Sequence, residues 1–138
     1  PCSNPLAALK VFESERRKGG FEHGTTTSFY FDCASFFFER ARFASDPATA
    51  AAFQEVALQI ITSVLELGLE DPVLMRLVAY RLQIESESGG DSDMLPVLSE
   101  VALSLFDRVK TLRPEEPQSC RDFALALAAK ASRMAGKG

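Results

Sequence analysis

The sequence repeats one pattern of apolar and acidic residues at a spacing of 45 positions. "VALQIITSVLELGLEDP" at residues 56–72 and "VALSLFDRVKTLRPEEP" at residues 101–117 share apolar positions and an acidic pair before a closing proline. Identical residues continue past these stretches, and the identical pairs include Val56 and Val101, Ala57 and Ala102, Leu58 and Leu103, Val64 and Val109, Leu67 and Leu112, Glu70 and Glu115, Pro72 and Pro117, Arg76 and Arg121, Ala79 and Ala124, and Leu82 and Leu127. Chance matches between alanine-rich helices do not explain a boundary that recurs in register with them. We therefore interpret the pattern as an internal structural repeat.

The apolar residues within the repeat follow the spacing of amphipathic helices. Asp-Pro pairs at 46–47 and 71–72 are typical of helix starts, because proline costs little in the first turn. No stretch alternates with period two for long enough to form a strand. The sequence therefore predicts an all-α fold of antiparallel helical hairpins with about six helices. The expected helices are 5–18, 29–43, 47–67, 72–84, 94–112 and 118–134.

Three repeats are expected, each opened by a helix with a small residue between bulky ones. These small residues are Ala34, Ala79 and Ala124, and a small side chain lets a neighbouring helix approach closely. The predicted organisation is a leading helix and linker at 1–23, then one repeat domain at 24–138. Its repeats span about 28–71, 72–116 and 117–135. The polar segment "ESESGGDSD" at 85–93 is expected to be mobile and dispensable.

Charge and composition exclude several functional classes. The net charge is −4, with 15 basic and 19 acidic residues and no basic run beyond 16–18, which argues against nucleic acid as a partner. The most apolar stretch, 48–69, is broken by Gln54, Glu55 and Glu66 and suits an amphipathic helix better than a membrane span. The first residues, 1–20, lack the basic head, long apolar middle and cleavage site of a secretory signal, so none is expected in this stretch. Three cysteines without short mutual spacing favour a reducing compartment, and we expect a cytoplasmic protein.

The sequence contains no pattern typical of a catalytic, metal or cofactor site. His23 is the only histidine and lacks the further ligands that zinc would require. The serines have no nucleophile-elbow glycines around them, and "KGGFEHG" lacks the lysine of a phosphate loop. We therefore expect no enzyme activity, no metal and no cofactor.

The repeat resembles the tetratricopeptide repeat (TPR), in which bulky and small residues alternate along a helical hairpin that ends in proline. The matching residues are Tyr30, Cys33, Ala34, Phe37, Ala57 and Ile61 in the first repeat, Met75, Val78, Ala79, Leu82, Ala102, Phe106 and Pro114 in the second, and Cys120, Phe123, Ala124 and Leu127 in the third. The period is about eleven residues longer than the usual 34. The resemblance implies hairpins stacked as a TPR-like right-handed superhelix, an α solenoid.

A second resemblance covers residues 28–128. "FYFDCASFFFERARF", "LMRLVAYRLQ" and "LFDRVKTLRPEEPQSCRDFALALA" are similar to the helical segment of large proteins that also carry inter-alpha-trypsin-type (VIT) and von Willebrand A domains. This resemblance implies a non-catalytic accessory module of a multidomain protein.

Stacked hairpins leave a concave surface that binds peptides or helices, so the sequence predicts a protein interaction module or scaffold. The repeat register places six residues on this surface: Phe31, Ser35, Arg76, Tyr80, Arg121 and Leu125. The two arginines suit a peptide or protein with acidic groups. Alternatively, they pair with acidic residues of the chain itself. The competing interpretation of the whole domain is a structural spacer that docks against sister domains or mediates self-association.

Overall fold

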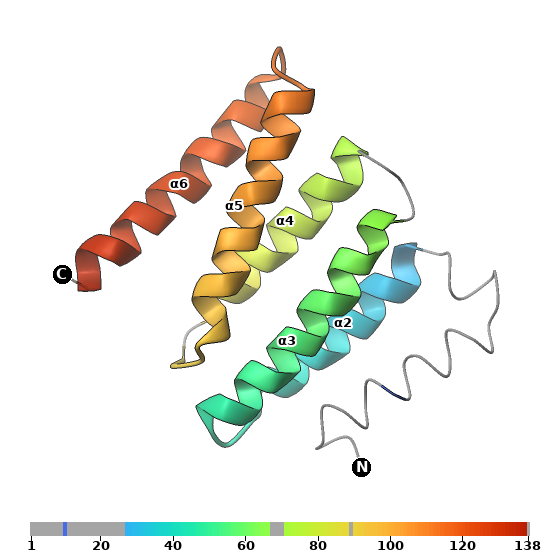
Figure 1. Ribbon diagram of the computed structural model, residues 1–138, viewed down its shortest axis with the longest axis vertical. Helices are drawn as coiled ribbons and strands as arrows, with labels where there is room; N and C mark the ends of the chain where they lie inside the picture. The colour runs from blue at the N-terminus through green and yellow to red at the C-terminus, as the bar shows by residue number, and fades with distance from the viewer. Residues whose placement is uncertain (1–9, 11–26, 67–70, 89, 138) are drawn as a thin grey trace. The chain divides into compact units, whose positions relative to one another are not determined.

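The computed structural model describes Lys10 and residues 27–66, 71–88 and 90–137. These residues form an all-helical structure without a strand, as predicted. With the labels of Figure 1, the helices are α2 (Thr27–Arg42), α3 (Pro47–Ser63), the 3-10 helix η1 (Val64–Glu66), α4 (Pro72–Ser86), α5 (Met94–Leu112) and α6 (Pro117–Lys137). About six α-helices were expected and five are described; of the expected leading helix at 5–18 only Lys10, which is helical, is among the described residues.

Two helices begin at the predicted Asp-Pro pairs. The Asp46 side chain accepts a hydrogen bond from the Thr49 backbone N–H at 2.8 Å, and Pro47 occupies the first turn of α3. Asp71 caps α4 in the same way and accepts from the Val73 N–H at 2.9 Å. Each carboxylate satisfies a backbone donor that has no partner within the helix.

The chain divides into two compact units, which we describe separately. The N-terminal unit comprises Pro1–Leu69 and Gly90–Met94. Its described helices α2 and α3 lie side by side in antiparallel directions (Figure 1). The rings of Phe37 and Phe53 lie 6.3 Å apart between them. The buried apolar side chains of this unit are Tyr30, Ala34, Phe37, Phe38, Ala41, Phe53, Val56, Ala57, Ile60, Ile61 and Val64.

A buried polar contact joins α3 to the segment before α5. The Ser92 hydroxyl donates a hydrogen bond to the side-chain carbonyl of Gln54, and both residues are buried. The Met94 N–H in turn donates to Ser92 Oγ at 3.1 Å. Glu85 and Ser86 are also buried, within the last turn of α4. The expectation that 85–93 is a loop with nothing to anchor it is therefore wrong for these residues, because their polar side chains are buried and have partners. That the segment is dispensable stays a prediction.

The C-terminal unit comprises Glu70–Gly89 and Leu95–Gly138 and contains α4, α5 and α6, which run antiparallel in succession (Figure 1). The rings of Tyr80 and Phe106 lie 5.4 Å apart and join α4 to α5. Lys130 and Glu100 form an ion pair at 2.9 Å that joins α6 to α5. The buried apolar side chains are Met75, Val78, Ala79, Leu82, Leu98, Ala102, Phe106, Val109 and Ala126.

The three repeat-equivalent alanines have different environments. Ala34 and Ala79 have no exposed surface, as expected for sites of close helix approach. Ala124 is exposed, so no such approach occurs at the third position. The repeat in sequence is thus not matched by equal burial.

Within the part of the chain that the structure describes, Pro47–Glu66 is one helical stretch long and apolar enough to cross a membrane by length and composition. Its mean hydropathy is 1.3. A core helix passes the same test, and α3 buries Phe53, Val56, Ile60 and Ile61 in the N-terminal unit.

Candidate functional site

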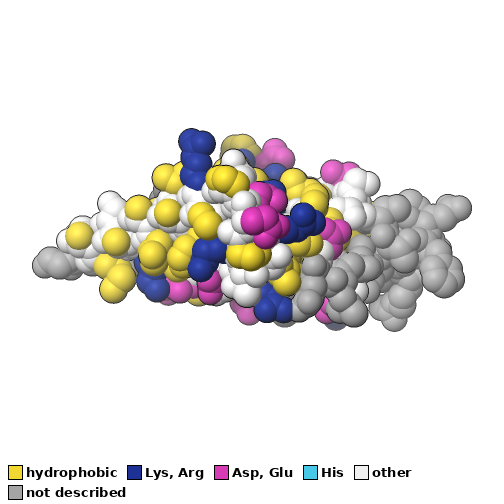
Figure 2. All heavy atoms as spheres, turned by 90° about the horizontal axis from the view of Figure 1, so that it is seen from above, with side chains coloured by type: hydrophobic (Ala, Val, Ile, Leu, Met, Phe, Trp, Pro, Cys, Tyr) yellow, Lys and Arg dark blue, Asp and Glu magenta, His cyan; other side chains and the backbone are white. Residues whose placement is uncertain are grey.

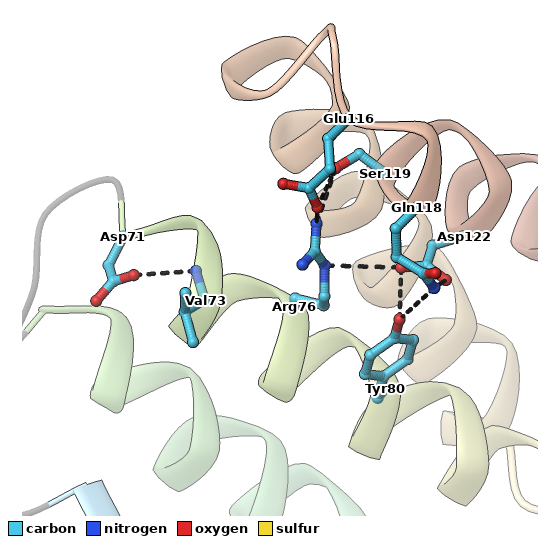
Figure 3. A network of polar contacts seen from close by, with 8 residues as sticks. All are labelled: Asp71, Val73, Arg76, Tyr80, Glu116, Gln118, Ser119 and Asp122. Atoms are coloured by element: carbon cyan, nitrogen blue, oxygen red, sulfur yellow. Dashed lines mark hydrogen bonds and ion pairs between the residues drawn. The ribbon is translucent and has the colours of Figure 1, made fainter.

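Arg76 lies at the centre of a polar network that joins α4 to the start of α6 (Figure 3). Its guanidinium donates a hydrogen bond through Nη2 to the Glu116 carboxylate and another, 2.8 Å long, to Ser119 Oγ. Its Nε lies 3.7 Å from Asp122 Oδ2. The first two turns of α6 place Ser119 and Asp122 on one side of that helix because they are three residues apart. A single arginine is thus compensated by two carboxylates.

Tyr80 extends this network by one helical turn along α4. Its hydroxyl donates to Asp122 Oδ2 at 2.5 Å, and Gln118 Nε2 donates to Tyr80 Oη at 3.1 Å and to Asp122 Oδ1 at 2.9 Å. Burial raises the pKa of Tyr80, and the hydrogen bond to Asp122 raises it further. The phenol therefore remains a donor at neutral pH and holds the buried carboxylate in place.

The hydrogen bond from Arg76 lowers the pKa of Glu116 below its usual value. Glu116 is therefore ionised at neutral pH and available to compensate Arg76. The sequence left open whether Arg76 faces a partner or pairs within the chain. The structure shows internal pairing, with the acidic residues before and within α6.

A shallow hollow lies beside this network in the C-terminal unit. It is lined by Tyr80, Gln83, Glu87, Phe106, Asp122, Leu125 and Ala126. Its volume is about 170 Å³. Pockets for small-molecule ligands usually measure roughly 300–1,000 Å³, so this hollow is of a size for a single side chain.

The structure brings together some of the six predicted surface residues but not all. Tyr80 and Leu125 line the same hollow, and Arg76 reaches Tyr80 through their shared partner Asp122. Phe31 and Ser35 are half-buried on α2, in the other compact unit. Arg121 is exposed and makes no ion pair with any described residue.

The surface of α6 carries further apolar side chains beside Leu125, which was the one apolar residue of α6 predicted to belong to the site. Leu125, Leu127 and Met134 are exposed by 60%, 47% and 65%. Ala124, Ala128, Ala131 and Ala135 on the same helix are exposed as well. Viewed from above in Figure 2, apolar side chains predominate over the C-terminal part of α6, at the left. Among the described charged side chains of α6, Arg121 is exposed, Lys130 and Arg133 are partly exposed, and Asp122 is buried.

A signal for this surface was present in the sequence. From Phe123 to Ala129 the sequence "FALALAA" has no polar residue, whereas an exposed helix face normally carries charged residues. The repeat register places Phe123, Ala124 and Leu127 at the helix-packing positions of Val78, Ala79 and Leu82 in α4. Those positions are buried in α4, but the equivalent positions in α6 are partly or largely exposed.

The described residues include no group of three or more His, Cys, Asp or Glu side chains that could hold a metal ion. Cys33 and Cys120 are free thiols. Burial raises the pKa of the Cys33 thiol, and the nearby Asp32 carboxylate adds to the effect, so the unreactive thiol form is favoured.

No protein-family model, curated protein or solved structure matches this chain. The described residues form an all-helical structure, and α6 exposes apolar side chains on its surface.

Proposed function

We propose that this chain is a non-catalytic, TPR-like protein interaction module of a larger multidomain protein, which binds a peptide or helix of another protein. The 45-residue repeat and the antiparallel helices support a stacked hairpin architecture. The observation that carries the function is the exposed apolar surface of α6, formed by Leu125, Leu127 and Met134 with the alanines between them. Contiguous apolar surface of this kind marks sites of protein association.

The position of Leu125 connects this surface to the predicted concave site. Leu125 lines the hollow with Tyr80 and is itself largely exposed. A partner helix on α6 can insert one side chain into the hollow while it covers the apolar face beside it. Arg76 contributes to the scaffold of this site rather than to the contact, because its charge is already compensated by Glu116 and Asp122.

A structural spacer is the second candidate. It is favoured by the network of Arg76, Tyr80 and Asp122, which ties α4 to α6 through several hydrogen bonds and suits a rigid element between domains. A spacer needs no separate partner protein. The two functions therefore differ in whether α6 contacts another polypeptide.

Capture with surface variants tests the proposed function. The immobilised chain is compared with its Leu127→Asp variant and with Val73→Asp, which places the same charge on an exposed apolar position of α4. We expect a protein from an extract of the source cells to be retained by the unchanged chain and by Val73→Asp but lost by Leu127→Asp. Equal retention by all three, or by none, would leave the spacer as the better interpretation. Circular dichroism of each variant verifies that the helices are intact.

A further inference from the structure

The hollow of the C-terminal unit has an acidic and aromatic lining without a cation. Its lining residues belong to α4, α5, α6 or the C-cap of α4, so it lies within one compact unit. Glu87 and Asp122 contribute carboxylates, Tyr80 and Phe106 contribute aromatic rings, and none of the lining residues is Lys, Arg or His. A hollow of this composition is complementary to a positively charged group.

The carboxylates of the hollow are not neutralised by the cations that the structure describes. Glu87 accepts a hydrogen bond from Gln83 Nε2 at 2.8 Å but makes no ion pair with a described residue. Asp122 shares Arg76 with Glu116. The Arg76 Nε lies 3.7 Å from Asp122 Oδ2, which is beyond hydrogen-bond distance. Negative charge therefore remains at the hollow.

The polar side chains of the hollow also offer more acceptors than donors. The Nε2 of Gln83 donates to Glu87, whereas its Oε1 is buried and accepts no hydrogen bond. The hydroxyl of Tyr80 donates its one proton to Asp122. A buried acceptor without a donor costs free energy, so a ligand that brings N–H donors would stabilise this site.

Aromatic and aliphatic side chains make the hollow suitable for a cation on a hydrocarbon stem. The rings of Tyr80 and Phe106, whose centres lie 5.4 Å apart, attract an ammonium or guanidinium group. The same unit already contains a contact of this kind, since Lys110 Nζ lies 4.9 Å from the centre of the Phe123 ring. Leu125 is largely exposed at the hollow and can cover a methylene stem.

From these observations we infer that the hollow binds a lysine or arginine side chain of the partner protein, with its cation near Glu87 and Asp122 and its stem against Leu125. The volume of about 170 Å³ is sufficient for one such side chain. This inference rests on the proposed function and specifies the chemistry of the partner. The charge is the reverse of the one expected from Arg76 in the sequence, because Glu116 and Asp122 already compensate that arginine.

The test is a titration of the full 138-residue chain with capped amino acids, followed by NMR of the backbone amide signals. N-acetyl-lysine amide and N-acetyl-arginine amide carry the cation, and N-acetyl-norleucine amide has a similar stem without charge. We expect the cationic probes to shift the signals of Gln83, Glu87 and Leu125 saturably. They should bind about 2- to 5-fold more tightly than the norleucine probe, the size of effect typical of an exposed ion pair. High salt should reduce this difference.

Two matched variants separate the hollow from the rest of the surface. Glu87→Gln removes an exposed carboxylate that lines the hollow, and Glu115→Gln removes an exposed carboxylate that does not line it. We expect Glu87→Gln to weaken binding of the cationic probes about 2- to 5-fold and to leave binding of the norleucine probe unchanged. Glu115→Gln should change neither. Circular dichroism verifies that both variants keep their helices.

Other outcomes would overturn the inference in distinguishable ways. Equal affinities for the charged and uncharged probes would refute a cationic ligand, and shifts confined to residues outside the hollow would refute the site. If no probe binds, the inference is wrong and the capture experiment alone decides on the proposed function. A partner that is retained in full by Glu87→Gln but lost by Leu127→Asp would uphold the proposed function and refute a basic side chain in the hollow.

The same measurements identify an occupant from the chain itself. If the cationic probes bind only after Arg16, Arg17 and Lys18 are replaced by Gln, these cations of the chain occupy the hollow and the inference is refuted. If sedimentation shows a dimer that Glu87→Gln converts to a monomer, the occupant is a second copy of this chain, which likewise refutes a separate partner.

Discussion

Tyr80 performs two tasks in the C-terminal unit. Its ring contacts Phe106, and its hydroxyl donates to the buried carboxylate of Asp122. We predict that Tyr80→Phe lowers the free energy of unfolding by about 1–2 kcal/mol, because a hydrogen bond to a charged group is lost while the ring contact remains. Urea unfolding measures the change. No loss of stability would mean that the α4 to α6 link is carried by Arg76 alone.

Ser92 provides a second test of a single polar contact. We predict that Ser92→Ala lowers the free energy of unfolding by about 1–3 kcal/mol, since the buried side-chain oxygen of Gln54 then loses its donor. Ser88→Ala is the control, because its hydroxyl is exposed and donates to a backbone carbonyl of the preceding turn. A similar effect of both substitutions in urea unfolding would show that the buried contact has no particular importance.

Repeat-equivalent faces of the helices differ in how deeply they are buried. We predict that Ala79→Leu lowers the free energy of unfolding by about 1–3 kcal/mol, because Ala79 has no exposed surface and the larger side chain overpacks the site. Ala124→Leu, the same substitution at the repeat-equivalent exposed position, should change stability by less than about 0.5 kcal/mol. Thermal unfolding of the two variants in parallel makes the comparison. Equal losses would indicate that Ala124 is covered in solution.

The stability of the protein as a whole should depend on pH at both ends of the range. The pKa of Glu116 is lowered from its usual 4.5, so its contribution is complete above that pH and is lost as the pH falls through the lowered pKa. The pKa of Tyr80 is raised from its usual 10.0, so its contribution is complete below that pH and is lost as the pH rises through the raised pKa.

Urea midpoints measured from acidic to alkaline pH test this prediction. Glu116→Gln should flatten the acidic decline and leave the alkaline decline in place, and Tyr80→Phe should do the reverse. Declines that remain unchanged in both variants would assign the pH dependence to other groups.

Much of the helical structure could be predicted from the sequence alone. Apolar spacing and the capping residues Asp46 and Asp71 depend on neighbours within one or two turns, so they identify the helices that begin at Pro47 and Pro72. The range predicted for the fifth expected helix, 94–112, is the same as that of α5. The periodicity also identified residues that are buried in both units, such as Ala34 and Ala79.

Whether each candidate site residue is buried, paired or exposed depends on the tertiary structure. Arg76 and Arg121 are identical in the repeat, yet Arg76 is compensated by Glu116 and Asp122, which lie 40 or more residues away, and Arg121 remains exposed. The composition of 85–93 predicted that Ser92 is dispensable, because its partner, Gln54, lies 38 residues away in sequence. The spacing of apolar and capping residues in the sequence indicates the helix and the helix face to which a residue belongs. Whether that face meets solvent, a carboxylate or another helix is set by contacts between distant segments, and only the folded chain contains them.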